Sequence, residues 1–195
     1  MDGAMRNVDV VTIKVVVTGP FAAGKTTLIS TISEIPVLAT ETSVSDESAA
    51  TKDHTTVTMD FGKLTVKDEE MLAELYMFGT PGQDRFDFMW DVLAEGMDGY
   101  ILMVDLSRGE DSLREAADIL EHFRDMSDAP FIVGANRGTA QPELVERLHE
   151  VLGADPQVEI VPCEATERES AKQLLLVLLI KVLSTLADDA EVAVS

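Results

Sequence analysis

The feature that most constrains this chain is a glycine-rich loop at residues 19–27, Gly-Pro-Phe-Ala-Ala-Gly-Lys-Thr-Thr, directly after an apolar run at residues 10–17. It fits the pattern G-x-x-x-x-G-K-[ST] between a strand and a helix, the context in which that pattern binds phosphate. The glycines let backbone N–H groups point at phosphate oxygens, and the following helix N-terminus adds further donors. Lys25 can reach the outer phosphates as a catalytic group, and Thr26 can bind Mg²⁺. The residues expected to contact a nucleotide here are Gly19, Phe21, Ala22, Ala23, Gly24, Lys25, Thr26 and Thr27.

The charge of the chain narrows the range of partners. Among 195 residues, 36 are acidic and 15 basic, which gives a formal net charge of -21. Such a chain repels nucleic-acid phosphates and anionic lipids, and no local basic patch offsets this. A single cysteine, Cys163, excludes an internal disulfide, and neither a signal peptide nor an apolar stretch of about 20 residues is found. We expect a cytoplasmic protein without an integral membrane segment, with any membrane association arising through partners.

Apolar runs alternate with helical patterns along the chain. Strands are predicted at residues 10–18, 56–66, 71–78, 100–104, 131–134 and 158–161, and helices at 26–34, 86–93, 111–126, 141–152 and 167–187. This alternation predicts an α/β fold, a mostly parallel six-stranded sheet with helices on both faces and one antiparallel hairpin strand, whose ligand site lies at the carboxyl ends of the strands. Residues 10–187 form one domain between a flexible N-terminus, 1–9, and a short acidic tail, 188–195.

Two segments outside the glycine-rich loop can complete a phosphate site. Residues 39–53 are rich in Ser, Thr and acidic residues, which favours a mobile loop. Thr56 ends that loop, so its hydroxyl can bind Mg²⁺ and its N–H can meet a γ-phosphate. A surface threonine that begins a strand explains the residue equally well, and Thr55 is a rival one position away.

The second segment is Gly79-Thr-Pro-Gly-Gln83, followed by Arg85. The N–H of Gly82 can contact a γ-phosphate, and the Gln83 side chain can orient an attacking water. Arg85 can supply positive charge to the transition state, although a solvated arginine at a helix start explains it as well.

The sequence of residues 79–83 resembles the second switch of Ras-like small GTPases, in which an aspartate is followed by two residues, a glycine and a glutamine. The likeness covers nearly the whole chain and implies the P-loop NTPase (G-domain) fold. It is closest to bacterial members, the gliding-motility polarity GTPase and the small GTPases of actinobacterial conservon operons, which also resemble residues 163–170. The chain departs from the pattern at Gly79, where the aspartate that holds Mg²⁺ through water is missing, so the resemblance implies weakened or rearranged metal binding.

The resemblance also implies a base-binding region in two loops. Asn136 matches the asparagine that hydrogen-bonds the purine and braces the loop at 19–27, and the stem of Arg137 can lie over the base. The backbone of Ala165 corresponds to the group that meets the guanine O6. Thr139 stands where the family has an aspartate that accepts hydrogen bonds from guanine N1 and N2. Because a hydroxyl accepts less and carries no charge, the resemblance implies that selectivity for guanine is lower by about 1–3 kcal/mol.

Three functions follow from these residues. The first is a switch that binds GTP or GDP with Mg²⁺, hydrolyses slowly, and presents residues 39–56 and 79–90 to signalling partners. By resemblance those partners include roadblock-type regulators and a sensor-kinase complex, and the chain is a monomer or a weak nucleotide-dependent dimer. The alternative is a degenerate GTPase acting as a nucleotide-fixed or nucleotide-free scaffold with relaxed base specificity, motivated by Gly79 and Thr139. A small P-loop kinase fits less well, since the sequence has no arginine-rich lid.

Overall fold

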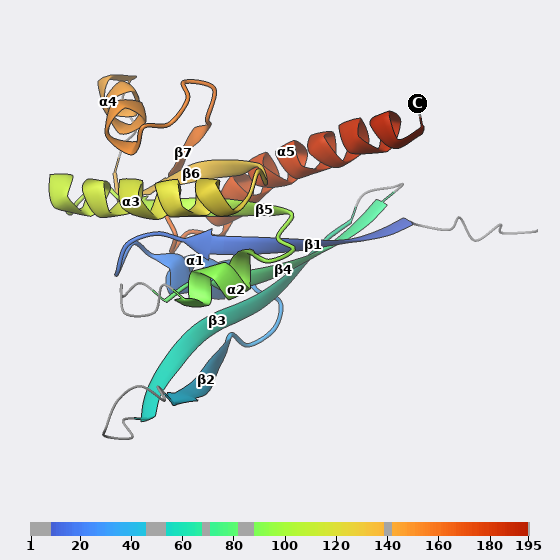
Figure 1. Cartoon of the computed structure of the whole chain (residues 1–195), viewed down its shortest axis with the longest axis horizontal. Coiled ribbons are helices and arrows are strands. Elements are labelled where there is room, and N and C mark those ends of the chain that lie inside the picture. Colours follow the sequence, from blue (N-terminus) through green and yellow to red (C-terminus); the bar gives the residue numbers. More distant parts are fainter. Residues whose placement is uncertain (1–8, 46–53, 68–70, 82–87, 139–141, 195) are drawn as a thin grey trace, which may run out of the picture.

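A twisted sheet forms the centre of the molecule (Figure 1). The computed structural model describes residues 9–45, 54–67, 71–81, 88–138 and 142–194. Within these residues seven strands follow the spatial order β2-β3-β4-β1-β5-β6-β7. They are β1 (Asp9–Thr18), β2 (Leu38–Ser45), β3 (His54–Lys67), β4 (Met71–Gly79), β5 (Gly99–Asp105), β6 (Phe131–Asn136) and β7 (Ile160–Cys163). Five strands, β4, β1, β5, β6 and β7, are parallel, whereas β3 is antiparallel to both β2 and β4.

Helices cover both faces of this sheet. They are α1 (Lys25–Ile32), α2 (Phe88–Ala94), α3 (Glu110–Met126), α4 (Pro142–Leu152) and α5 (Arg168–Val194). Leu28 and Ile29 of α1 share one buried core with Leu174 and Leu178 of α5. The opposite core contains Trp90, Leu93, Leu113, Leu120, Phe123 and Leu148 of α2, α3 and α4. The predicted fold class, a mostly parallel α/β sheet with an antiparallel hairpin strand, is confirmed.

Continuous apolar sequence explains the centre of the sheet. Every residue of β5 is buried, as are residues 132–136 of β6, because helices pack on both faces of these strands. Antiparallel pairing of Leu64 with Leu75 and of Phe61 with Phe78 confirms the hairpin predicted around residues 67–70. Its two strands therefore hold residues of β3 directly beside residues of β4.

The sheet contains one strand more than predicted. Residues 39–53 were expected to form a mobile loop, but residues 38–45 form β2, which pairs with β3 from Leu38 opposite Phe61 to Ser45 opposite His54. The polar composition suggested a loop, yet Thr40, Thr42 and Val44 are β-branched and suit an edge strand once a partner is available. The β2–β3 hairpin extends away from the rest of the sheet (Figure 1).

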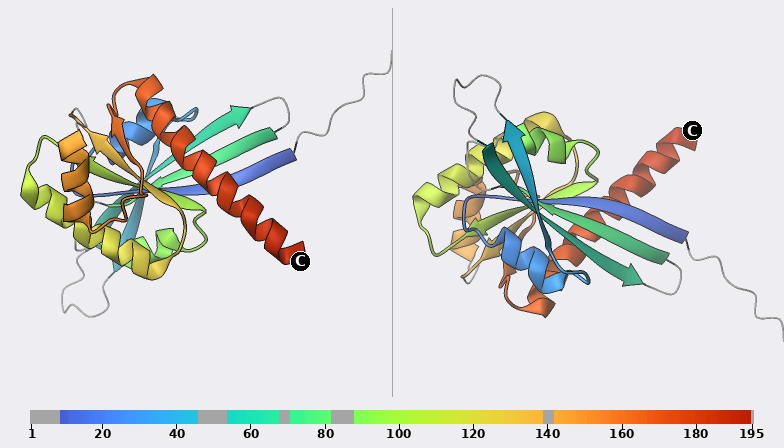
Figure 2. Two further views of the ribbon diagram at one scale, coloured as in Figure 1. Left: turned by 90° about the horizontal axis from the view of Figure 1, so that it is seen from above. Right: turned by 90° about the horizontal axis from the view of Figure 1, so that it is seen from below.

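The last helix is longer than predicted. It continues to Val194, beyond the expected end at residue 187, and its final turns project away from the strands (Figure 2). Over residues 168–188 it is long and apolar enough to cross a membrane by length and composition. The sequence expectation counted only the apolar run at residues 174–180. Leu174, Leu175, Leu178 and Leu179 of this helix are buried in the core of the domain, which gives its apolar residues a structural use.

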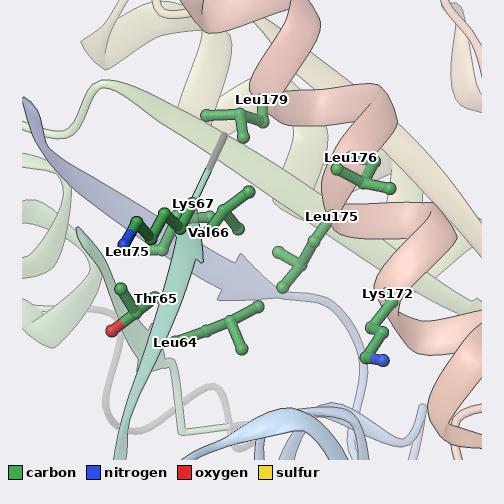
Figure 3. Close-up of a pocket in the computed structure, with 9 residues that line it drawn as sticks. All are labelled: Leu64, Thr65, Val66, Lys67, Leu75, Lys172, Leu175, Leu176 and Leu179. Carbon is green, nitrogen blue, oxygen red and sulfur yellow. The ribbon is translucent and has the colours of Figure 1, made fainter. Parts of the chain in front are cut away.

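An apolar groove lies between α5 and the β3–β4 hairpin (Figure 3). It has a volume of about 260 Å³ and is lined by leucines, among them Leu64, Leu75, Leu175 and Leu179. Lys172 lies at its edge with the amino group beside the helix (Figure 3). The groove is therefore apolar and is formed by segments other than the glycine-rich loop.

Candidate nucleotide and magnesium site

The glycine-rich loop at residues 19–27, here called the P-loop, connects β1 to α1 at the carboxyl edge of the sheet. Gly19 has φ 134° and Gly24 has φ 106°, values that favour glycine. A Cβ on Gly19 would lie 2.2 Å from the Met103 carbonyl oxygen, and one on Gly24 would lie 2.4 Å from Asn136 Nδ2. Both glycines are therefore required for the loop to pass close to β5 and β6. Such a loop leads into α1, whose first N–H groups lack partners within the helix and are therefore able to bind an anion.

Lys25 lies inside this loop and is only 7% exposed. Its ammonium donates to the carbonyl oxygens of Gly19, at 2.6 Å, and Pro20, at 2.8 Å. Burial lowers the pKa of Lys25 from 10.5 to about 8, although the carboxylates of Glu115 and Asp60 act in the opposite direction. A buried cation whose charge is compensated only in part is suited to bind phosphate oxygens.

Thr26, the second residue of α1, is joined to β3. Its hydroxyl donates to Asp60 Oδ2 at 2.5 Å. Asp60 lies opposite Gly79 in the antiparallel register of β3 and β4, at the edge where the P-loop begins. A hydroxyl and a carboxylate side by side are the oxygen ligands that Mg²⁺ takes together with substrate phosphates. The residues present therefore fit the metal that the P-loop implies.

Asn136, at the end of β6, joins the P-loop to the loop after β7. Its side-chain amide donates to the Ala23 carbonyl oxygen at 2.9 Å, and its side-chain oxygen accepts from the N–H of Ala165 at 3.1 Å. Asn136 is 1% exposed, so both of its polar atoms are satisfied within the protein. The P-loop and the two loops predicted to hold the base thus form one hydrogen-bonded unit.

Arg137 strengthens the same unit from the next position. Its guanidinium donates to the Ala22 carbonyl oxygen at 3.0 Å and to Asp105 Oδ2 at 2.5 Å. Asp105, at the end of β5, is buried and also accepts from the N–H and hydroxyl of Ser107. Burial alone would raise the pKa of Asp105, but the bonds from Ser107 and Arg137 outweigh it and hold the pKa below its ordinary value. The Arg137 stem is thereby fixed beside the P-loop.

The structure brings together most of the residues singled out in the sequence. Those in the P-loop and at the ends of β6 and β7 form the unit just described. Phe21 is 59% exposed, and its carbonyl oxygen accepts from Arg108 at 2.6 Å. Thr27 follows Thr26 in α1.

Other predicted site residues are not placed at this unit. Thr56 lies within β3, opposite Ser43 of β2, and its side chain is outside the described residues. Gly82, Gln83, Arg85 and Thr139 also lie outside the described residues. Their roles remain predictions. Within the predicted partner segment at 79–90, Trp90 is 7% exposed and packs beside His122 and Phe123, so it belongs to the core.

Two carboxylates at the site, Asp60 and Asp105, were not selected from the sequence. A signal for Asp60 was present, because the predicted hairpin places it beside the end of β4, where Gly79 lacks a carboxylate. Asp105 ends an apolar strand that was already predicted, and a lone carboxylate at the carboxyl edge of a parallel sheet is a candidate on position alone.

Comparison with known proteins identifies the family. Residues 17–182 match the family described as conserved hypothetical ATP binding protein. The chain belongs to this ATP-binding family. An uncharacterised protein of Methanocaldococcus jannaschii is 33% identical over 97 residues, which are 50% of this chain and 53% of that protein. The chain thus spans about half the length of this relative. Family membership supports nucleotide binding by this chain.

The family match corrects the resemblance drawn from the sequence. The chain had been likened to Ras-like small GTPases and the conservon GTPases, but the family that matches 17–182 is the ATP-binding one. The likeness rested on a P-loop, an asparagine at a strand end and a glycine–glutamine pair, and a shared fold with a few shared site residues does not by itself fix the function. The chain departs from the Ras-like motifs at Gly79 and Thr139, which is consistent with this correction.

Proposed function

We propose that the chain binds the magnesium complex of a purine nucleoside triphosphate in the P-loop and slowly hydrolyses it to the diphosphate. The observation that carries this proposal is the buried Lys25 ammonium inside a loop shaped by Gly19 and Gly24. Asn136 ties that loop to Ala165, on the far side of the expected base site. Family membership supports nucleotide binding, and the fit of Thr26 and Asp60 to Mg²⁺ supports the metal complex.

The residues divide the work of binding and hydrolysis. Backbone N–H groups of the P-loop and the Lys25 ammonium hold the phosphates, and Thr26 and Asp60 would hold Mg²⁺, which would neutralise charge on the phosphate oxygens. Gln83, by prediction, orients the attacking water, and Arg85 is the candidate for charge stabilisation. Even P-loop enzymes that supply an arginine in cis hydrolyse at only about 10⁻² s⁻¹ without an activator, so hydrolysis is expected at that rate or slower.

Base recognition is proposed to be relaxed among purines. Asn136 and Arg137 hold the loop beside the base, but Thr139 brings no charge to read guanine N1 and N2. The matched family is described as ATP binding, which also argues against strict guanine selection. We therefore expect ATP and GTP to compete for the site with affinities within about tenfold of each other. This corresponds to a difference in binding free energy of at most about 1.4 kcal/mol.

A nucleotide-fixed or nucleotide-free scaffold is the second candidate, suggested by the missing carboxylate at Gly79 and by Thr139. Asp60 lies beside that position, within hydrogen-bonding distance of Thr26, so the chain retains a carboxylate at the site. This contact supports the nucleotide-binding proposal over the scaffold. Identification by chromatography of nucleotide extracted from the freshly purified protein separates the two. A nucleoside di- or triphosphate supports binding, whereas a nucleotide-free protein that also fails to bind added nucleotide supports the scaffold.

We also propose that the β2–β3 hairpin changes with nucleotide state and meets protein partners. Asp60 of β3 contacts Thr26 of α1, so a ligand that engages Thr26 acts on the strand that carries the hairpin. Hydrogen exchange measures this effect. Peptides from residues 54–67 are expected to exchange more slowly with a magnesium nucleotide than without it, while peptides from residues 142–152 stay unchanged. If exchange in residues 54–67 is the same with and without the magnesium nucleotide, the switch is contradicted.

Hydrolysis is tested by single-turnover assays with labelled ATP and GTP. The wild-type chain is expected to release phosphate slowly from both. Lys25→Met is expected to lose this activity at concentrations that saturate the wild type, because it removes the charge that holds the phosphates. Lys172→Met, on α5, is the matched control and keeps wild-type activity. A Lys25→Met variant that hydrolyses as fast as the wild type would exclude the P-loop as the site.

A further inference from the structure

The carboxylate at the magnesium site comes from a strand that the P-loop motif does not include. β3 is antiparallel to β4, and its Asp60 lies opposite Gly79, the last residue of β4. Pairing in an antiparallel ladder holds two such residues about 5 Å apart at Cα. A side chain on either of them therefore reaches the same edge of the sheet.

Asp60 occupies space that a side chain at position 79 would need. A Cβ built on Gly79 would lie 3.1 Å from Asp60 Cβ and 3.2 Å from Asp60 Oδ2. It would also lie 3.0 Å from Ile29 Cδ1. A side chain at position 79 would therefore require Asp60 or Ile29 to shift by a few tenths of an ångström, whereas the glycine leaves the neighbouring carboxylate undisturbed.

The contact of Asp60 fixes its direction. Oδ2 accepts from the hydroxyl of Thr26, the P-loop residue expected to bind Mg²⁺. Asp60 is therefore directed at the P-loop side chain that would meet the metal.

We propose that Asp60 of β3, together with Thr26, holds the nucleotide-bound Mg²⁺ in place of a carboxylate at position 79. This inference rests on the proposed function, because it assigns a metal residue at the same nucleotide site. Mg²⁺ commonly takes one or two protein oxygens and keeps waters and phosphate oxygens for its other positions. Thr26 and Asp60 would supply the protein oxygens, and Asp60 would do so directly or through a bound water.

The first test replaces the carboxylate and measures the metal rather than the turnover. Binding of Mn²⁺, as a paramagnetic substitute for Mg²⁺, is followed by electron paramagnetic resonance with excess nucleoside diphosphate. Asp60→Asn is expected to weaken Mn²⁺ binding by about 10- to 100-fold, the range seen when residues supporting a metal are changed. Asp118→Asn, an exposed carboxylate on α3, is the matched control and leaves the affinity unchanged.

The second test moves the carboxylate to the neighbouring strand. In Asp60→Gly/Gly79→Asp, the new side chain takes the space vacated by Asp60, and Ile29 Cδ1 shifts slightly. This double variant is expected to bind Mn²⁺ within about tenfold of the wild type, and thus more tightly than Asp60→Asn. Gly79→Asp alone crowds two carboxylates together and is expected to lower the melting temperature of the metal-free protein.

The outcomes separate the two proposals. If the wild type binds nucleotide and Asp60→Asn keeps wild-type Mn²⁺ affinity, the role of Asp60 is wrong while the proposed function stands. If Asp60→Asn does not fold, the double variant provides the test. A folded double variant that fails to bind Mn²⁺ contradicts the proposal that a carboxylate in the space between positions 60 and 79 holds the metal. A wild-type chain that binds no nucleotide overturns both proposals.

Discussion

Lys25 is the residue on which the proposed phosphate site most depends. Its ammonium is buried and donates to two neutral carbonyl oxygens, which do not neutralise its charge. The lowered pKa expresses the cost of that burial in the free protein. Phosphate oxygens favour the charged form and raise the pKa again on binding. Nucleotide binding and protonation of Lys25 are therefore linked.

The linkage predicts a pH dependence of affinity. Below about pH 8 the free protein already carries the Lys25 proton, so affinity is independent of this group. Above that pH the proton must be taken up on binding, and affinity falls by up to about tenfold per pH unit. Calorimetry at pH 9 in buffers of different ionisation enthalpy measures the uptake, expected at about 0.9 proton per nucleotide. Constant affinity from pH 7 to 9.5 would contradict the assignment.

At the residue scale, the sequence located the loop but not every group that serves it. The spacing of Gly19, Gly24 and Lys25 is sufficient to predict a phosphate site, because glycine geometry and helix position are local properties. Asp60 is distant from the P-loop in sequence, and its contact with Thr26 arises only when β3 pairs with β4. Strand register is set by the whole hairpin, so this group follows from the fold.

At the element scale, the side chain of Asn136 at the end of β6 joins the loops that follow β1 and β7. Asn136 satisfies the Ala23 carbonyl and the Ala165 N–H in a site closed to water. Such a bond network fixes the shape of the P-loop before a ligand arrives. The resulting preorganisation lowers the cost of ordering the loop on binding.

Removal of this amide tests its structural role. Asn136→Ala is expected to lower the free energy of unfolding by about 1–3 kcal/mol, since it leaves a buried carbonyl and a buried N–H without partners. It is also expected to weaken nucleotide binding by about tenfold or more. Urea unfolding and equilibrium titration measure the two effects. Gln173→Ala, an exposed amide on α5, is the control, and equal stability of both variants would contradict the account.

Elements buried on both faces were predicted well, and the edge of the sheet was not. The uniform burial of β5 matches its continuous apolar sequence, so periodicity alone identified it. β2 has a polar sequence whose local preferences suit a loop, and it becomes a strand through pairing with β3. Likewise α5 continues past its predicted end to Val194, since alanine and glutamate among its last residues favour the helix.

At the scale of the whole molecule, charge is the dominant feature. A net charge of -21 on 195 residues makes acidic groups repel one another across the folded surface. The exposed ion pairs, such as those of Arg114 on α3, contribute little against this. The same charge opposes the approach of an anionic nucleotide, which the P-loop N–H groups and Lys25 are proposed to offset.

Salt is therefore expected to stabilise the protein. Raising NaCl from about 20 mM to 500 mM shortens the screening length several-fold. A gain of about 1 kcal/mol raises the melting temperature by about 2–4 °C in a domain of this size. Differential scanning calorimetry at constant pH measures the shift, with KCl at equal ionic strength as the control for ion identity. A melting temperature that falls with salt would show that ion pairs outweigh the repulsion.

The most direct test of the central claim is a calorimetric titration of the nucleotide-free chain with magnesium complexes of non-hydrolysable ATP and GTP analogues. The account predicts one saturable site per chain with a dissociation constant below about 10 μM, occupied by both analogues and lost in Lys25→Met. Absence of saturable binding to the folded wild type, or equal binding by Lys25→Met, would contradict it.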